Sequence, residues 1–228
     1  MENPDFILLG DSHASAIGSA ARSSGLNFAG GPLASGRDFY VPFCERSRGA
    51  IRFLTDDMNA LHQQLCDMTG LDNLVSSELP LLCTIGSGFH IAATTALWST
   101  FMDQQGDPEA GFLESALFHE MCMALFEPAL QFYTILRDAG RRIAFVLPPQ
   151  RCPETSHWRI MLAFQAKAIE SLEALDCSII DTRATTSQDG RQRDGFCKAN
   201  DPIHGNDAFG AVVLQHAGHL TDDGALHR

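Results

Sequence analysis

Phe6-Ile-Leu-Leu-Gly-Asp-Ser-His-Ala14 is the stretch that decides the fold. Its first four residues are apolar and end at a glycine, a pattern typical of a strand buried on both faces of a parallel sheet. Residues 14–22 are rich in small side chains and favour a helix. Ser12 is therefore predicted at the carboxyl end of a strand and the amino end of a helix. Open α/β sheets bind ligands there, and free backbone N–H groups stabilise negative charge.

Length and composition indicate an ordinary globular protein. The 228 residues suffice for a sizeable core, and we expect one domain over 1–228 with a disordered tail at 221–228. A net charge of -12 without a basic patch argues against nucleic acid or an anionic membrane as the main partner. No apolar run approaches the roughly 18 residues of a membrane-spanning helix. The oligomeric state is left open.

The compartment is predicted from two features. The first strand begins by residue 6, which leaves no room before it for a secretory signal. The seven cysteines are scattered singly and are odd in number, which favours reduced thiols over a disulfide framework. We therefore expect a cytoplasmic protein.

Strand and helix patterns alternate along the chain. Further strands are predicted at 25–29, 79–85, 143–147 and 177–181, and helices at 56–68, 90–102, 109–126, 128–139, 155–175 and 207–219. An extended segment is expected at 37–44, and an exposed loop or hairpin at 189–200. This alternation predicts an α/β fold with a mostly parallel sheet.

Two short motifs carry a family resemblance. Gly10-Asp11-Ser12 resembles the first sequence block of the SGNH (GDSL-type) hydrolases, which are esterases and acyl hydrolases. Asp201-Pro-Ile-His204 resembles the family's last block, in which Asp and His complete a triad with the serine. The resemblance implies a three-layer α/β/α sandwich with a flavodoxin-like, five-stranded sheet in the order 2-1-3-4-5. It also implies hydrolysis of a small-molecule ester without a metal or cofactor.

The three residues suit acyl transfer chemically. A serine hydroxyl needs a base to remove its proton as it attacks an acyl carbon. His204 is predicted to be that base, with Asp201 as the acceptor that fixes its tautomer and stabilises the imidazolium. The Gly-x-Ser-x-Gly motif of the nucleophile-elbow hydrolases is absent, which argues against that superfamily.

The oxyanion hole is predicted from the resemblance. It would combine the N–H of Ser12 with the N–H of a glycine in the loop after the second strand, for which Gly36 fits best and Gly31 second. The family's third block adds an asparagine, which is missing from Gly86-Ser-Gly88-Phe-His90. Gly88 stands in the asparagine's place in strict register, whereas a two-residue slip places His90 there. Because a histidine N–H can donate to an oxyanion, we favour His90.

Four residues are expected to contact the substrate: Asp11, His13, Gly31 and Arg151. Asp11 and His13 flank the serine in sequence. Gly31 belongs to the glycine-rich loop just described, and Arg151 to a proline-rich loop after the strand at 143–147. Both loops are predicted at the carboxyl edge of the sheet, where the serine also lies.

Two other functions are considered. Because the family's asparagine is missing, the chain could be an SGNH-like module that binds an acyl or carbohydrate group or a protein partner without turnover. Asp11-Ser-His13 also fits the Asp-x-His that opens metallophosphoesterases, with Gly218-His219 as their late Gly-His. The mid-chain ligand block of that family is absent. We rank the ester hydrolase first, the binding module second and the metal-dependent phosphoesterase last.

Overall fold

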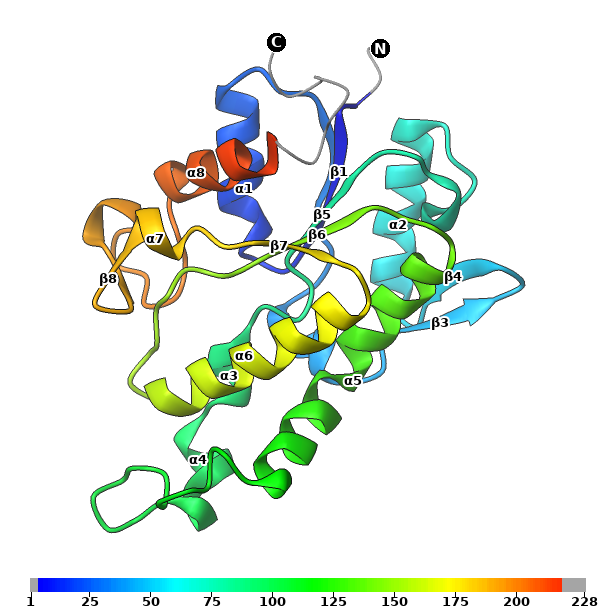
Figure 1. Ribbon diagram of the computed structural model, residues 1–228. Coiled ribbons are helices and arrows are strands. Elements are labelled where there is room, and N and C mark those ends of the chain that lie inside the picture. Colours follow the sequence, from blue (N-terminus) through cyan, green and yellow to red (C-terminus); the bar gives the residue numbers. More distant parts are fainter. Residues whose placement is uncertain (1–3, 219–228) are drawn as a thin grey trace.

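A five-stranded, fully parallel sheet forms the centre of the computed structural model, which describes residues 4–218 (Figure 1). Its strands are β1 (Phe6–Gly10), β2 (Phe28–Pro32), β5 (Leu81–Cys83), β6 (Ile143–Val146) and β7 (Ser178–Ile180). They lie in the order β2-β1-β5-β6-β7, which is 2-1-3-4-5 when only these strands are counted. The predicted α/β class, sheet order and α/β/α layering are therefore confirmed.

Five long helices cover the two faces of the sheet. They are α1 (Ala14–Ser23), α2 (Asp56–Thr69), α5 (Ala116–Asp138), α6 (Trp158–Ala174) and α8 (Asp207–Ala217). Helices α1 and α8 pack against each other on one face, and the other three cover the opposite face (Figure 1). None of the helices within residues 4–218 is both long and apolar enough to cross a membrane.

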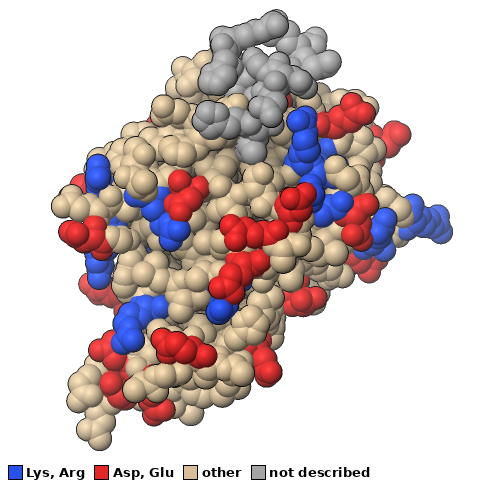
Figure 2. Space-filling view, in the orientation of Figure 1, with Lys and Arg blue, Asp and Glu red and all other residues tan. Residues whose placement is uncertain are grey.

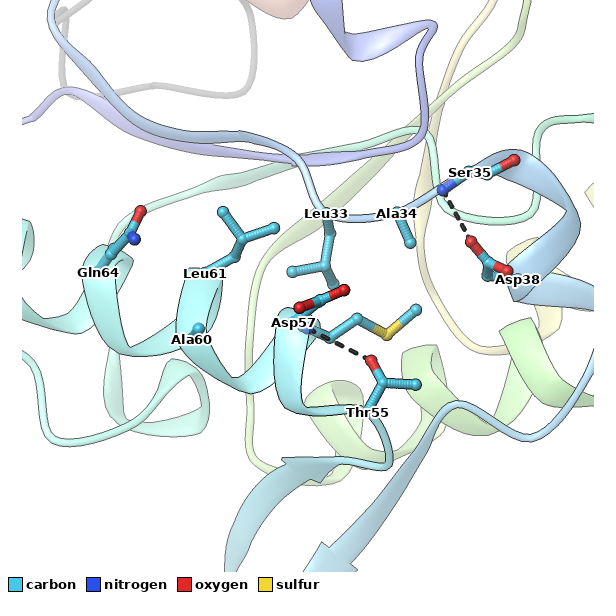
Figure 3. A pocket seen from close by; sticks show the side chains of 10 residues that line it. Leu33, Ala34, Ser35, Asp38, Thr55, Asp57, Ala60, Leu61 and Gln64 are labelled. Carbon is cyan, nitrogen blue, oxygen red and sulfur yellow. Dashed lines mark hydrogen bonds between the residues drawn. The ribbon is translucent and has the colours of Figure 1, made fainter.

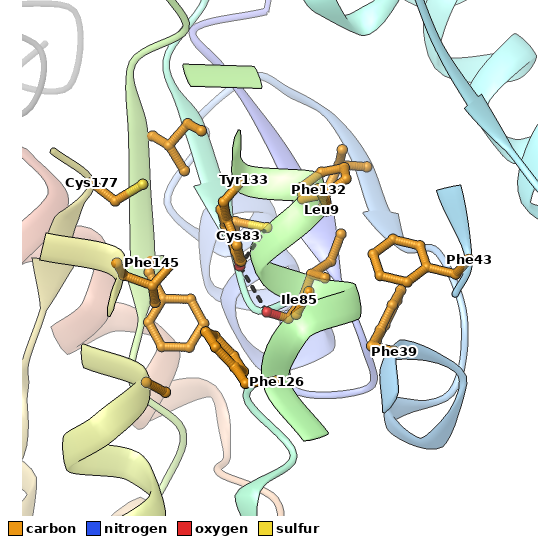
Figure 4. Close-up of a cluster of buried hydrophobic side chains, with 14 of the residues drawn as sticks. Leu9, Phe39, Phe43, Cys83, Ile85, Phe126, Phe132, Tyr133, Phe145 and Cys177 are labelled. Carbon is orange, nitrogen blue, oxygen red and sulfur yellow. Dashed lines mark hydrogen bonds between the residues drawn. The ribbon is translucent and has the colours of Figure 1, made fainter. Parts of the chain in front are cut away.

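Each central strand buries both of its faces, because successive side chains point in opposite directions. In β1, Phe6 and Leu8 enter the core beside α1 and α8. Ile7 and Leu9 enter a larger core that is rich in aromatic rings (Figure 4). There Tyr133 of α5 lies wholly buried, and its hydroxyl donates to the carbonyl of Ile85 at 2.7 Å. This double burial explains the uniformly apolar β1 sequence.

The shorter elements lie mostly in the connections. They are α3 (Phe89–Ala92), α4 (Thr95–Trp98), α7 (Arg183–Thr186), the strands β3 (Cys44–Ser47), β4 (Ala50–Phe53), β8 (Ser187–Gln188) and β9 (Arg191–Gln192), and the 3-10 helices η1 (Gly36–Tyr40), η2 (Leu74–Ser76), η3 (Ser99–Phe101) and η4 (Asp194–Phe196). The extended segment predicted at 37–44 is wrong in its first half, because η1 occupies residues 37–40. β3 and β4 then form a hairpin whose turn residues, Arg48 and Gly49, have positive φ values of 51° and 83°.

Two predicted helix boundaries were also wrong. α5 continues through Pro128, although an interior proline removes one backbone hydrogen bond, and the burial of Phe126, Ala129 and Phe132 on this helix offsets that loss. The helix predicted at 90–102 is instead interrupted at Thr94, which is extended and forms a β-bridge with Ser156. The predicted tail at 221–228 and His219 lie outside the described residues.

Candidate active site

Ser12 lies immediately after β1, in a turn that the buried carboxylate of Asp11 holds. Oδ1 of Asp11 accepts hydrogen bonds from the backbone N–H of His13 and from Oγ1 of Thr84, both at 3.0 Å. Gly10 makes this approach possible, because a Cβ at Gly10 would lie 1.8 Å from Oγ1 of Thr84. His13 is the N-cap residue of α1, without a side-chain cap. The Ser12 hydroxyl is exposed and does not cap the helix.

A loop at the other end of the chain brings a histidine to Ser12. Nε2 of His204 lies 2.6 Å from Oγ of Ser12, and Nδ1 of the same ring lies 2.7 Å from Oδ2 of Asp201. A carboxylate can only accept, so Nδ1 carries the proton and Nε2 is free to accept from the Ser12 hydroxyl. His204 thus lies within hydrogen-bonding distance of both other residues assigned to catalysis from the sequence.

Asp201 is fixed by the backbone of its own loop. Its Oδ1 accepts from the N–H groups of Ile203 and His204 at 2.9 and 2.8 Å. Partial burial by itself raises the pKa of Asp201. The two backbone hydrogen bonds and the contact with the His204 ring together outweigh burial and hold the pKa well below its usual value. Asp201 is therefore a carboxylate throughout the neutral range.

Arg151 supports this loop from outside. Its Nη1 donates to the carbonyl oxygens of His204 and Lys198 at 3.1 and 3.3 Å. The backbone N–H of Lys198 also donates to the His204 carbonyl, at 3.0 Å. Arg151 was expected to contact the substrate, but it does not line either cavity beside Ser12. Its contacts instead position the histidine.

The first cavity beside Ser12, called here the Gly36 cavity, has a volume of about 220 Å³. Its lining includes Asp11, Ser12, His13, Gly36, His90, Ile91 and Ile203. The backbone N–H groups of Ser12 and Gly36 donate no hydrogen bond to any other described residue. Gly36 begins η1, and a Cβ there would lie 3.0 Å from Cδ1 of Ile91 and 3.2 Å from Oδ2 of Asp11. The two N–H groups predicted for an oxyanion hole therefore border one small cavity.

His90, and not Gly88, reaches this cavity. Cδ1 of Ile91 lies 3.0 Å from the position that a Cβ at Gly88 would take, so Ile91 covers Gly88. Burial, with smaller effects of His13, His204 and Arg37, lowers the pKa of His90 to about 4. Its ring is therefore neutral at pH 7, with one N–H that can donate. Gly31, in contrast, lies within β2 and does not line the cavity.

His13 lies between the two histidines. Its ring is 5.1 Å from that of His204 and 6.2 Å from that of His90, between centroids. Burial is the main cause of the lowered pKa of His13, so this ring is also neutral at pH 7. Its Nδ1 is buried and has no hydrogen-bond partner among the described residues. The ring of His204, which faces Ser12, therefore lies beside a neutral imidazole, and that imidazole lies beside a second one.

A second cavity, called here the Asp207 cavity, also borders Ser12 and has a volume of about 340 Å³. Its lining includes Ser12, Ser15, Ser19, Lys198, His204 and Asp207. Ser12 and His13 are the residues that line both cavities. The serine hydroxyl is therefore reachable from two differently lined sides.

A larger groove of about 700 Å³ lies between residues 33–38 and α2 (Figure 3). It shares Ser35 with the Gly36 cavity but contains neither Ser12 nor His204. The face in Figure 2 carries intermixed acidic and basic side chains and no continuous basic patch. Within residues 4–218, no group of three or more His, Cys, Asp or Glu side chains could hold a metal ion.

Sequence reasoning missed three residues that shape the site. Thr84 fixes Asp11, Ile91 forms a wall of the Gly36 cavity, and Ser156 donates from Oγ to the His90 carbonyl at 2.6 Å. The position of Thr84 at the end of a predicted strand was a usable signal. For Ile91 and Ser156 the sequence holds no signal, because their roles depend on contacts between distant segments.

Comparison with known proteins agrees with this architecture. No protein-family model matches the sequence, and no curated protein matches it. Among solved structures, an SGNH hydrolase from Slackia heliotrinireducens is similar over 96% of this chain and 98% of that chain, with 11% identity and a TM-score of 0.48. A Bacteroides fragilis protein described as an acylhydrolase is similar over 99% of this chain and 91% of that chain, with 9% identity and a TM-score of 0.50. The chain has the SGNH-hydrolase fold.

Another solved structure that the chain resembles is the lipase/acylhydrolase from Enterococcus faecalis. The similarity extends over 94% of this chain and 95% of the Enterococcus chain, with 14% identity and a TM-score of 0.44. The structural neighbours are thus hydrolases, esterases and acylhydrolases. At these identities the similarity concerns the fold, and the family resemblance of the two terminal motifs agrees with it.

Proposed function

We propose that this protein is a serine-dependent ester hydrolase that forms an acyl-enzyme on Ser12. The observation that carries the proposal is the line of short contacts from Ser12 through the His204 ring to Asp201, at 2.6 and 2.7 Å. A base within reach of the hydroxyl proton is what a serine needs to act as a nucleophile at neutral pH. The SGNH fold and the small-molecule cavities on both sides of Ser12 support the same reading.

In the first half of the reaction, Oγ of Ser12 attacks the acyl carbon of the ester while His204 takes the hydroxyl proton on Nε2. Asp201 stabilises the resulting imidazolium through Nδ1. The negative charge on the former carbonyl oxygen is met by the N–H groups of Ser12 and Gly36, with the N–H of the neutral His90 ring as a third donor. His204 then gives its proton to the departing alcohol, and the acyl group stays on Ser12.

In the second half, a water molecule takes the place of the alcohol. His204 removes a proton from the water, whose oxygen attacks the acyl carbon. The bond to Oγ of Ser12 breaks, the proton returns to Ser12, and a carboxylic acid leaves. The cycle consumes one water and needs no metal or cofactor. Arg151 keeps the His204 loop in place during both proton transfers.

The first test is labelling with a fluorophosphonate, which reacts covalently with activated serines, followed by intact-mass measurement. We expect one adduct on the wild type and none on Ser12→Ala or His204→Ala. Two matched controls change the same residue types at exposed positions away from the site: Ser23→Ala at the end of α1 and His119→Ala on α5. Both controls should be labelled as the wild type is.

Two outcomes would contradict the proposal. An adduct that persists in Ser12→Ala would place the reactive nucleophile elsewhere. A folded wild type that takes no adduct would favour the alternative function, a module that binds an acyl or carbohydrate group without turnover. Circular dichroism of each variant shows that the protein under test is folded.

A further inference from the structure

The two cavities beside Ser12 divide a bound ester between them. The carbonyl oxygen must reach the N–H groups of Ser12 and Gly36, and Gly36 lines the Gly36 cavity. The departing oxygen must reach Nε2 of His204, and His204 lines the Asp207 cavity but not the Gly36 cavity. The acyl group therefore stays in the Gly36 cavity, and the alcohol part extends into the Asp207 cavity.

The Gly36 cavity limits the acyl group. Its volume of about 220 Å³ falls below the roughly 300 to 1000 Å³ of pockets that hold drug-sized ligands. The carbonyl oxygen takes part of that space. Cδ1 of Ile91 lies 3.0 Å from the positions that a Cβ would take at Gly36 and at Gly88, so this methyl group packs against both loops and forms part of the cavity wall. Apart from Ile91, Ile203 and Gly36, every residue that lines the cavity has a polar or charged side chain, so a longer hydrocarbon chain finds few apolar side chains to pack against.

The Asp207 cavity suits a neutral group with several hydroxyls. Asp207 accepts one hydrogen bond, from Oγ of Ser19 at 2.9 Å, and a carboxylate can accept several more. Lys198 offers an ammonium donor, and Ser15 an exposed hydroxyl. The negative charge of Asp207 and the positive charge of Lys198 together favour a ligand without net charge that both donates and accepts hydrogen bonds. The hydroxyl groups of a sugar or another polyol can do both.

We propose that the substrate is a short-chain acyl ester, acetyl to butyryl, of a sugar-like polyhydroxy compound, and that Ile91 sets the limit on acyl length. This inference rests on the proposed ester hydrolysis. The reaction uses one water: the bond between the acyl carbon and the alcohol oxygen breaks, and a short carboxylic acid and the free polyol leave. No other co-reactant is required.

The acyl arm of the test compares 4-nitrophenyl acetate, butyrate and octanoate, which share one leaving group. We expect kcat/KM to fall at least tenfold from butyrate to octanoate, since one methylene too many in a fitted pocket costs about 10- to 200-fold. Ile91→Ala should raise the octanoate value about tenfold, and Ile91→Val should do so to a smaller extent. Ile179→Ala is the matched control, because Ile179 on β7 is half-buried and lines neither cavity.

The alcohol arm compares 6-O-acetylglucose with hexyl acetate by release of acetic acid. We expect the wild type to prefer the sugar ester. Asp207→Asn should raise KM for the sugar ester on the order of tenfold relative to KM for hexyl acetate, because a hydrogen bond from a sugar hydroxyl to a charged group is lost. Asp194→Asn is the control, because Asp194 begins η4 and lines neither cavity.

The outcomes separate this inference from the function on which it rests. Three results would overturn the substrate class while Ser12-dependent hydrolysis stands. They are hydrolysis of octanoate as fast as acetate, octanoate values for Ile91→Ala and Ile91→Val that both match Ile179→Ala, and a preference for hexyl acetate over the sugar ester. If no ester is turned over faster by the wild type than by Ser12→Ala, the proposed function and this inference both fail.

Discussion

Replacing His90 by glutamine should make the protein less sensitive to acid. Burial, with smaller effects of His13, His204 and Arg37, lowers the pKa of His90 from its usual 6.5 to about 4. Between these two values the unfolded chain binds a proton at this position and the folded chain does not. Stability from the neutral ring is therefore complete above about pH 6.5 and is lost as the pH falls toward 4. Glutamine fills similar space, keeps an N–H donor and does not titrate.

The size of the effect follows from the pKa difference. Each unit of pKa difference between the folded and unfolded chain is worth about 1.4 kcal/mol. Lowering the pKa of His90 from 6.5 to about 4 therefore corresponds to about 3 kcal/mol when protonation of the unfolded chain is complete. At pH 4.5 most of this, about 2 to 3 kcal/mol, should already be lost.

The assay is urea unfolding of the wild type and His90→Gln at pH 8 and pH 4.5, at one ionic strength, followed by tryptophan fluorescence. The measured quantity is the fall in the free energy of unfolding between the two pH values. We expect this fall to be about 2 to 3 kcal/mol smaller in His90→Gln. The pH 8 pair is the internal control, because His90 is neutral in both states there. Equal falls in the two proteins would refute the reasoning, because His90 would then titrate alike in both states.

Three further variants test the loop and the helix contact around the site. Asp201→Asn removes the acceptor that fixes the His204 tautomer, so kcat for 4-nitrophenyl acetate should drop by about 10⁴-fold; a drop below tenfold would show that Asp201 is dispensable. Arg151→Met removes two hydrogen bonds to the His204 loop and should cost about 1 to 3 kcal/mol in urea unfolding, and unchanged stability and kcat would contradict that role. Gly210→Ala on α8 would place a Cβ 2.2 Å from the Ala16 carbonyl oxygen of α1 and should cost about 1 to 3 kcal/mol, whereas an unchanged melting temperature would show that the helices separate freely.

The sheet could be predicted from the sequence because its strands are buried on both faces. Residues 6–9 and 143–147 have no polar side chain, and glycine or proline follows each run closely. Such runs between helical patterns permit few topologies besides a parallel sheet. The continuous α5 could not be predicted in this way, because a proline normally marks a boundary and only packing in the aromatic core outweighs that local preference.

The candidate site could be predicted only where local chemistry was sufficient. Ser12 and the Asp201–His204 pair belong to short motifs with recognisable spacing, and the fold brings them together. The substrate contact of Arg151 stays a prediction, and its hydrogen bonds to the carbonyls of Lys198 and His204 could not be predicted, because the sequence does not locate those carbonyls. Ile91 forms a cavity wall because its side chain lies close to two glycines in different loops, and no pattern along the sequence predicts that contact.

The packing of α1 against α8 has a consequence for how the protein is made. α1 begins two residues after Ser12, and α8 begins three residues after His204, which lies 192 positions after Ser12 in the chain. On the ribosome Ser12 emerges early, without His204. His204 reaches Ser12 only when α8 emerges and docks on α1. If Ser12 is the nucleophile, a half-made chain holds an ordinary, unreactive hydroxyl, and hydrolytic activity begins only after nearly all of the fold is in place.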